Sequence, residues 1–478
     1  MTYSGFAKAC YSPTGLPQYD GNPLIECLPP ICTEADVVKF IGNYPDKPSA
    51  EELALAPKVR GHGINRLKDV VIPLDVHLQL EDGFSQLIRY GYIARDPFTT
   101  ESIRHRQPKS VSAVSSGFKS SANIMTLIGL SGMGKTTALN SITKLYPQVV
   151  SHGKYKRRSF IQTQIVWLKI DCPHDGSLRG FCAAFFASLD NALGIEKYAS
   201  MAQKRNSVSV MLQQISQLCK AFFVGVLIID EMQHLTSSRG GHDRETLLNF
   251  FVTLSNEAGV PLVYVGTNAM LPLFSGVLRN ARRAAGMGEI TFDRFEIDDP
   301  FWDYLVSRLW EYDWTGTNSD LTANLRNKIY NLSQGNTDFL VKLLMLGQRH
   351  VIAEDLDGIT AEVLQHVYDN QMRMLHKPIE ALRSGDPLQI ADYEDMMPTK
   401  DQVALMMSYD LARRIKRADL ALVMKVAPPI VQKSRKRSVS NTVSVVSSDS
   451  LASVHLDPDG DIQEQLVKRG WTDDDAAW

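Results

Sequence analysis

Residues 129–136 read Gly-Leu-Ser-Gly-Met-Gly-Lys-Thr, which matches the spacing GxxxxGK[ST] of a phosphate-binding loop. An apolar run at 124–128 precedes this stretch and a segment with helical periodicity follows it, which is the setting that such a loop needs. The glycines let backbone N–H groups face phosphate oxygens, and the start of the helix adds its positive end. We expect Lys135 to reach the β and γ phosphates of ATP and the Thr136 hydroxyl to ligate Mg²⁺. The predicted nucleotide contacts in this stretch are Gly129, Ser131, Gly132, Met133, Gly134, Lys135, Thr136 and Thr137.

A second apolar run, 226–229, ends in two acidic residues, Asp230 and Glu231. Asp230 is suited to hold the magnesium together with Thr136, and Glu231 to polarise the attacking water. The alternative is that the two carboxylates only end a strand and have no catalytic role. The phosphate-binding loop upstream makes this alternative less favoured. The acidic pair therefore predicts hydrolysis of ATP, and not binding alone.

The apolar run 261–265 also ends in polar residues, in the order Gly-Thr-Asn. Thr267 or Asn268 is a candidate for a catalytic sensor that hydrogen-bonds the γ phosphate or the attacking water. Turn chemistry at a strand end explains the same three residues. Both interpretations stay open at this point.

A cluster of arginines at 279–283 is the candidate for a contact between subunits. In a ring-forming ATPase, an arginine at this place would reach the nucleotide of the neighbouring subunit and stabilise charge in the transition state. We prefer Arg282 or Arg283 for this role, and Arg279 is the next candidate. A solvated basic helix face is the alternative.

The charge balance makes any nucleic-acid surface a local one, because 51 Lys and Arg face 53 Asp and Glu and the net charge is −2. The best basic patch lies between the helix after the phosphate loop and the next strand, and a solvated loop is its alternative. It consists of Lys154, Lys156, Arg157 and Arg158.

A second candidate for DNA contact is the strand-to-helix junction that contains His174, Ser177 and Arg179. Free backbone N–H groups at a helix start can hold a phosphate of the DNA backbone. N-capping alone also explains Ser177.

The cysteines and the apolar runs indicate the cellular setting. The six cysteines form no CxxC pair and no pair spaced with histidine, which argues against zinc and against disulfides and favours a reducing cytosol. The longest apolar stretch, 221–229, is far shorter than the roughly 18 residues of a membrane helix. We expect a soluble, cytoplasmic protein that has no membrane partner.

The fold class is predicted as α/β, because apolar runs at 124–128, 165–170, 224–229 and 262–265 alternate with segments of helical period. Helices take over after Pro300. We expect a parallel sheet between helices, followed by a small helical lid domain. The predicted division is an extended N-terminal arm at 1–60, a subregion with a linker at 61–121, the ATPase core at 122–298, the lid at 299–395 and a C-terminal extension at 396–478, largely disordered beyond about 428.

The sequence resembles the TnsC/TniB family, the AAA+ ATPase regulators of Tn-type DNA transposition, and more distantly the helicase-loader ATPases. Stretches outside the nucleotide motifs carry this resemblance, which covers residues 15 to 395. They are 19–26 and 28–30 in the arm, 89–92, 168–172 with 176–178, 233–235 after the acidic pair, 248–253, 281–283, and His376 with 380–385.

The resemblance implies an AAA+ core and an ATP-dependent oligomer on duplex DNA, as a hexameric or heptameric ring or as a filament. Such an oligomer connects a target-selection protein of the TnsD or TniQ type, alone or with the RNA-guided complex of a CRISPR-associated transposon, to a transposase of the TnsA or TnsB type. Hydrolysis disassembles it. The nucleotide roles fall on Lys135, Thr136, Asp230 and Glu231, and the DNA role on the junction at 174–179 and the basic patch.

Two positions differ from the family or stay open. Many relatives carry an arginine after the position of Gly335 that reaches the nucleotide from the lid, whereas this chain has Asp338 there, and Lys342 is not equivalent to a guanidinium. The basic segment 433–437 is similar to the end that contacts the transposase, and a flexible tail explains it as well.

Two other functions are weighed against the transposition regulator. A helicase, helicase-loader-like or remodelling motor fits less well, because the chain has one phosphate loop and no recognisable helicase motif after residues 230–234. A scaffold that binds ATP without turnover would require that Glu231 be misplaced.

Overall fold

A parallel β-sheet forms the centre of the computed structural model, which describes residues 6–106, 118–203, 206–237, 241–275, 286–317, 319–385, 443–446 and 453–456. The five strands lie in the order β5-β6-β7-β2-β8, and every neighbouring pair is parallel. Their bounds are β2 Ile124–Gly129, β5 Trp167–Asp171, β6 Val226–Asp230, β7 Leu262–Gly266 and β8 Glu289–Phe292. The predicted α/β fold with a parallel sheet is confirmed, and each of the four apolar runs supplies one strand.

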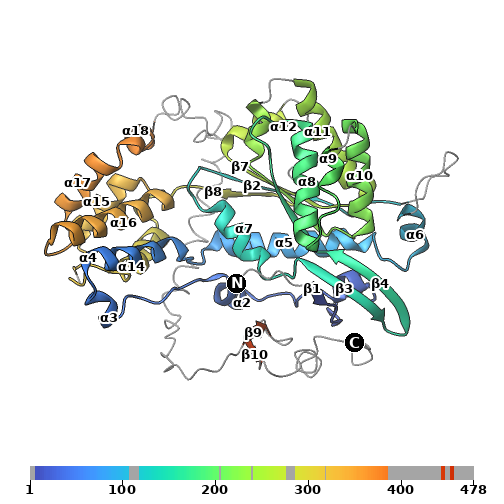
Figure 1. Cartoon of the computed structure of the whole chain (residues 1–478), viewed down its shortest axis with the longest axis horizontal. Helices are drawn as coiled ribbons and strands as arrows, with labels where there is room; N and C mark the ends of the chain where they lie inside the picture. The colour runs from blue at the N-terminus through green and yellow to red at the C-terminus, as the bar shows by residue number, and fades with distance from the viewer. Residues whose placement is uncertain are drawn as a thin grey trace.

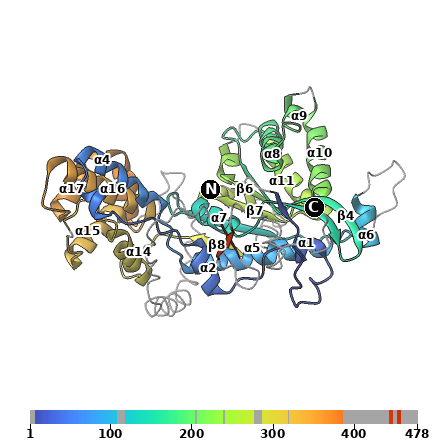
Figure 2. The same ribbon diagram turned by 60° about the horizontal axis from the view of Figure 1, so that its bottom comes forward.

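Helices cover both faces of the sheet, because its strands are apolar on both sides. Along β6, Leu227 and Ile229 pack into one hydrophobic core, whereas Val226 and Ile228 pack into another. The helices α8 (Leu178–Leu193), α10 (Val208–Ala221) and α11 (Gly241–Thr253) cover the first face, and α5 (Asp75–Ile93) and α7 (Lys135–Thr143) cover the second. Figures 1 and 2 show α5 along one side of the sheet and α8 and α10 on the other.

An antiparallel hairpin that the sequence analysis missed lies between α7 and β5. Its strands are β3 (Val149–Tyr155) and β4 (Arg158–Ile165), and β1 (Phe6–Lys8) pairs in parallel with β3. The basic patch was expected in a loop, and it instead occupies the end of this hairpin, where Lys156 adopts a φ of 53°. The hairpin extends away from the sheet at the lower right of Figure 1.

The segment predicted as an extended arm contains short helices: α1 (Pro23–Glu26), α2 (Glu34–Ile41), α3 (Ala50–Leu53) and α4 (Pro57–Gly63), followed by the 3₁₀-helix η1 (Ile64–Asp69). Reciprocal capping boxes start two of them, from Thr33 with Asp36 and from Ser49 with Glu52. This segment contacts α5 of the core and α16 of the helical region. It therefore connects the two parts of the molecule, as the blue helices beside the orange ones in Figure 1 illustrate.

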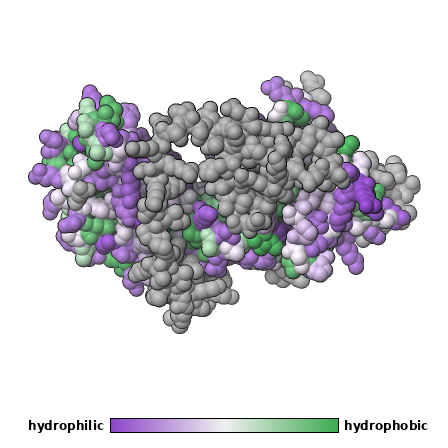
Figure 3. All heavy atoms as spheres, turned by 90° about the horizontal axis from the view of Figure 1, so that it is seen from below, coloured by the Kyte–Doolittle hydropathy of each residue, from purple (hydrophilic) through white to green (hydrophobic). Residues whose placement is uncertain are grey.

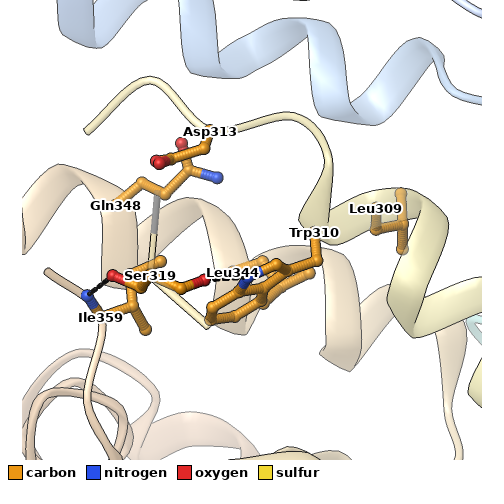
Figure 4. A pocket seen from close by; sticks show the side chains of 7 residues that line it. All are labelled: Leu309, Trp310, Asp313, Ser319, Leu344, Gln348 and Ile359. Atoms are coloured by element: carbon orange, nitrogen blue, oxygen red, sulfur yellow. Dashed lines mark hydrogen bonds between the residues drawn. The ribbon is translucent and has the colours of Figure 1, made fainter. Parts of the chain in front are cut away.

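The helical region after the sheet begins where Asp299 caps a helix with Pro300 in its first turn. Its helices are α14 (Pro300–Trp310), α15 (Ala323–Ser333), α16 (Thr337–Glu354), α17 (Ala361–Gln371) and α18 (His376–Ser384), with the short 3₁₀-helix η5 (Arg373–Leu375) before α18. A small hollow lies between these helices, and hydrogen bonds to Ser319 connect its walls. Trp310 Nε1 donates to Ser319 O at 2.8 Å, and Ile359 N donates to Ser319 Oγ at 3.3 Å. Figure 4 shows the side chains that line this hollow, with Ser319 between Trp310 and Ile359.

The remaining described elements connect these parts. They are α6 (Thr100–Arg106), α9 (Ser200–Gln203), η2 (Met232–Ser237), the π-helical turn η3 (Leu254–Ala258), η4 (Asn268–Met270), α12 (Pro272–Ser275) and the antiparallel pair β9 (Val443–Val446) and β10 (Ser453–Leu456). The rest of the predicted C-terminal extension, with the basic segment 433–437, lies outside the described residues. Within the described ranges, no helix is both long enough and apolar enough to cross a membrane.

Candidate nucleotide-binding site

The predicted phosphate loop lies between β2 and α7 and needs glycine for close approach. At Gly129, where φ is +155°, a Cβ atom would lie 2.2 Å from the carbonyl oxygen of Phe292 on β8. Gly132 and Gly134 both have positive φ, and α7 begins directly afterwards at Lys135. The loop thus turns tightly into the start of a helix, as the spacing of the motif predicts.

Lys135 is buried, with 9% of its surface exposed. Its Nζ donates to the carbonyl oxygens of Gly129 at 2.9 Å and Leu130 at 2.8 Å. These bonds hold the ammonium group at the loop. Because a buried ammonium group needs acceptors or an anion, the position suits a phosphate contact.

The loop meets the acidic end of β6 through Thr136, whose Oγ1 donates to Asp230 Oδ2 at 3.1 Å. Asp230 is buried, with 3% of its surface exposed. A hydroxyl and a carboxylate at this distance suit Mg²⁺, which takes oxygen ligands and is usually held by one or two carboxylates together with the phosphates. The described residues contain no group of three or more acidic, histidine or cysteine side chains that could hold a metal by themselves. The donor set therefore fits a nucleotide-bound magnesium.

Glu231 follows in the left-handed region, with a φ of 58°, which is uncommon for a residue other than glycine. Its N–H donates to Asp230 Oδ1 at 2.9 Å, and its carboxylate accepts a hydrogen bond from Gln233 Nε2. Gln233 Oε1 in turn accepts from Thr267 N at 3.1 Å. Gln233 thereby connects the proposed water-activating carboxylate to the end of β7. The sequence analysis included Gln233 in a stretch that carries the family resemblance but gave it no role in the site.

Two polar atoms at the end of β7 are buried without a hydrogen-bond partner in the described structure. They are Thr267 Oγ1 and Asn268 Oδ1, on side chains that are 5% and 4% exposed. Buried polar atoms are nearly always paired, so an orphaned pair needs an explanation. A turn at the strand end would not leave both atoms unpaired, which favours the sensor interpretation over the turn.

The helical region contacts the phosphate loop at the start of α16. Asn336 Nδ2 donates to Ser131 O at 2.9 Å, and Thr337 Oγ1 donates to Gly132 O at 2.6 Å. The backbone N–H of Asp338 also donates to Gly132 O, at 3.0 Å. The sequence analysis considered Lys342 for a lid contact, and it instead pairs with Asp338 on its own helix.

Replacing Asn336 by alanine is expected to weaken nucleotide binding by about threefold to tenfold, because one hydrogen bond to the loop is lost. Asn336 also caps α16, so the melting temperature should fall as well. Thr360→Ala is the matched control, since it removes the cap of α17 without touching the loop. Titration with a fluorescent nucleotide should separate the two variants, and equal affinities would contradict the loop contact.

The other predicted nucleotide residues lie around this loop. Met133 is buried, whereas Ser131 and Thr137 are exposed at the loop and the first turn of α7. The arginine candidates Arg279, Arg282 and Arg283 lie outside the described residues.

The two predicted DNA-contact regions lie at opposite edges of the sheet. The hairpin strand β4 leads into the amino end of β5, whereas the junction at 174–179 follows its carboxyl end. The structure does not bring these two regions together.

At the junction itself, each predicted side chain has a partner. Ser177 Oγ accepts from Gly180 N at 3.1 Å and caps α8, and Arg179 donates to the carbonyl oxygens of Ala202 and Asn206. His174 Nδ1 lies 3.3 Å from His234 Nε2. Ser177 therefore caps α8, and a DNA contact at this junction stays a prediction.

One protein-family model matches the part of the chain that contains this site. A protein-family model described as an AAA domain matches residues 118–274. This range contains the phosphate loop, Asp230, Glu231 and both sensor candidates. No curated protein sequence matches the chain.

Several solved structures are similar to the chain at low sequence identity. The Walker-type ATPase PABY2304 of Pyrococcus abyssi is 14% identical, with 62% of this chain and 84% of that chain covered and a TM-score of 0.35. The ADP form of the ORC2 protein of Aeropyrum pernix is 12% identical, with 52% and 62% covered and a TM-score of 0.36. The RuvB Holliday junction branch migration motor of Thermotoga maritima is 15% identical, with 61% and 70% covered and a TM-score of 0.30.

The fold assignment rests on the AAA domain match together with the parallel sheet between two layers of helices and the loop that joins β2 to α7. The chain has the AAA+ P-loop fold, and its residues 118–274 match the AAA domain.

Proposed function

We propose that the chain binds and hydrolyses ATP with Mg²⁺ at the site between β2, β6 and β7. The observation that carries this proposal is the contact of 3.1 Å between Thr136 Oγ1 and Asp230 Oδ2, because it joins the phosphate loop to the acidic strand end. When bound, Mg²⁺ would neutralise phosphate charge. Lys135 would bind the β and γ phosphates, and Thr136 and Asp230 would hold the metal.

Glu231 is the proposed general base, since a carboxylate beside the metal-binding residue can accept a proton from the attacking water. Thr267 Oγ1 could donate to the γ phosphate or bind that water, and Asn268 Oδ1 could accept from the water, which supplies the partners that these buried atoms lack. Arg282 or Arg283 is proposed to complete the site of a neighbouring subunit, so that hydrolysis depends on assembly.

We propose further that this ATPase is a regulator of DNA transposition of the TnsC type, in which ATP favours assembly on duplex DNA and hydrolysis reverses it. The support comes from sequence stretches that generic AAA+ proteins lack and that pack against one another here. Asn22 Nδ2 donates to Tyr92 O at 2.9 Å, and the Arg89 guanidinium donates to Pro29 O. The arm stretch 19–30 and the stretch 89–92 thus form one packed unit on the core.

This unit also contacts the hairpin, both at its base and beside its turn. Gln164 on β4 donates to Leu24 O at 3.0 Å and accepts from Cys27 Sγ at 3.1 Å. Tyr155 OH donates to Glu26 Oε2 at 2.8 Å. The arm therefore holds the hairpin in place, which suits a role of the hairpin in binding a partner.

The proposed partners follow from the resemblance. They are duplex DNA, further copies of this chain in a ring or filament, a target-selection protein of the TnsD or TniQ type, and a transposase of the TnsA or TnsB type. The same proposal includes the predicted division of the chain into arm, core, lid and C-terminal extension.

The test is electron microscopy of the chain with duplex DNA and a non-hydrolysable ATP analogue. Regular rings or filaments on the DNA are expected with the analogue and should be absent without nucleotide. A parallel unwinding assay addresses the motor alternative. Efficient ATP-driven strand separation by the chain alone would overturn the proposed regulator.

Neutralising the basic patch at the hairpin end is expected to flatten the salt dependence of DNA affinity. Hydrophilic side chains gather over the end of the molecule where this hairpin lies (Figure 3). Each cation that meets a phosphate contributes about 0.9 to the slope of log K against log salt. The variant replaces Lys154, Lys156, Arg157 and Arg158 by glutamine.

The control for this variant removes the same amount of charge from exposed lysines of the arm and the helical region, namely Lys39, Lys58, Lys68 and Lys377. Fluorescence anisotropy with a DNA duplex at several salt concentrations gives both slopes. A hairpin variant with the slope of the control would remove the hairpin from the DNA contacts.

A further inference from the structure

Lys169 on β5 places a second cationic group at the magnesium-binding end of the site. Its Nζ lies 2.8 Å from Asp230 Oδ2 and 3.9 Å from Asp171 Oδ1. The Lys169 side chain is 22% exposed, that of Asp230 is 4% exposed and that of Asp171 is 75% exposed. The lysine therefore lies between a buried carboxylate and a solvated one.

The pairing of the two strands explains this arrangement. Strands β5 and β6 are parallel, with Lys169 opposite Ile228 and Asp171 opposite Asp230. Side chains two residues apart on a strand share a face, so Lys169 and Asp171 lie on the same side of the sheet. Lys169 thus reaches the carboxylate of either strand without any movement of the backbone.

Both oxygens of the Asp230 carboxylate accept hydrogen bonds in this arrangement. Oδ2 accepts from Lys169 Nζ and from Thr136 Oγ1, and Oδ1 accepts from Glu231 N. The oxygen that faces the Thr136 hydroxyl, where magnesium is proposed to bind, is therefore the one that the lysine occupies. A buried carboxylate without a counter-ion is strongly unfavourable, so Lys169 stabilises Asp230 when no metal does.

We propose that Lys169 is an internal counter-ion that competes with Mg²⁺ for Asp230, and that Asp171 is the acceptor to which it moves when the metal binds. Two cations that share one oxygen in a poorly solvated site repel each other, so metal binding favours the displaced lysine. The flexible stem of lysine permits the shift, and the exposed Asp171 receives the ammonium group close to solvent. The proposal rests on the proposed nucleotide site.

If Lys169 competes with Mg²⁺, replacing Lys169 and replacing Asp171 should change the Mg²⁺ affinity in opposite directions. Lys169→Met removes the competitor, and the Mg²⁺ concentration for half-maximal binding of a fluorescent ADP is expected to fall by about threefold to tenfold. Asp171→Asn removes the alternative acceptor, so the same midpoint should rise by about twofold to fivefold. Lys169→Arg keeps the positive charge, so its Mg²⁺ midpoint should lie closer to that of the wild-type chain than the midpoint of Lys169→Met does.

Thermal unfolding supplies a second measurement, which does not depend on turnover. Without nucleotide, Lys169→Met should melt at a lower temperature than the wild-type chain, because Asp230 is left buried and unpaired. Saturating Mg²⁺ and ADP should remove most of this difference, since the metal replaces the lysine. A purely structural lysine would lower the melting temperature equally with and without the ligands, and that result would overturn the proposal.

The outcomes separate this inference from the proposed function. If the wild-type chain showed no Mg²⁺-dependent nucleotide binding, the proposed nucleotide site itself would be wrong. If the wild-type chain bound nucleotide with Mg²⁺ and both Lys169→Met and Asp171→Asn left the Mg²⁺ midpoint unchanged, the counter-ion role alone would be wrong. Asp171 lies on the surface, so its variant tests the proposal even if the Lys169 variant fails to fold.

Discussion

Lys135→Ala is expected to weaken ATP binding by about tenfold to hundredfold and to abolish nucleotide-dependent assembly on duplex DNA. The Lys135 ammonium group is buried at the phosphate loop, where its Nζ donates to the carbonyl oxygens of Gly129 and Leu130. Hydrogen bonds to charged groups contribute about 1.5 to 3 kcal/mol, which corresponds to the expected loss of affinity. Titration with a fluorescent ATP analogue measures the first effect, and electron microscopy on DNA measures the second.

Lys144→Ala is the matched control for this variant. Lys144 follows the last turn of the same helix, α7, and is exposed, so its replacement removes an equal charge at a distance from the loop. The control should bind ATP and assemble like the wild-type chain. Undiminished ATP affinity of Lys135→Ala would contradict the assignment of residues 129–136 as the phosphate loop.

The parts of the site that could be predicted from the sequence are those that local pattern determines. The spacing of glycines before Lys135 requires a tight turn into a helix, and an apolar run requires a buried strand. Because the strands are parallel, their carboxyl ends share one edge, which brings Thr136 to Asp230 across 94 positions of sequence. The phosphate-loop motif and the parallel direction of the strands together were enough to predict the contact between Thr136 and Asp230.

The parts that could not be predicted depend on how separate elements dock. Asn336 reaches Ser131 across 205 positions, whereas the sequence analysis looked for a lid contact at Asp338 and Lys342 and did not consider Asn336. Lys169 reads as one polar residue within an apolar strand, and its role becomes visible only once β5 is paired with β6. Such contacts are set by tertiary packing, which local propensity does not encode.

The hairpin was missed for a different reason. Its strand β4 mixes exposed, intermediate and buried positions without regular alternation, so the period of two residues that indicates a strand is weak. The positively charged residues within 154–158 also favoured the prediction of a solvated loop. Pairing with β3 and the arm strand β1 supplies the order that the local sequence lacks.

Glu231→Gln is expected to lower the rate of ATP hydrolysis by about a hundredfold to ten-thousandfold while ATP binding is retained. The amide keeps the size of the carboxylate and can still meet Gln233, but it cannot accept a proton from water. If hydrolysis reverses assembly, the oligomer on DNA should persist in ATP, where that of the wild-type chain disassembles. Steady-state phosphate release and time-resolved light scattering measure the two effects.

The adjacent residue offers the sharpest comparison, because Asp230→Asn should fail in a different way. Asp230 accepts from Thr136, Lys169 and the backbone of Glu231, so its replacement disturbs the proposed metal site and should weaken Mg²⁺-dependent binding before any chemistry. Neighbouring carboxylates would then give opposite phenotypes: a persistent oligomer for Glu231→Gln and little assembly for Asp230→Asn. If Glu231→Gln hydrolysed ATP at the wild-type rate, the general base would have to be another residue. If both variants instead lost assembly equally, Glu231 would support binding, and the switch from binding to hydrolysis could not be assigned to this pair.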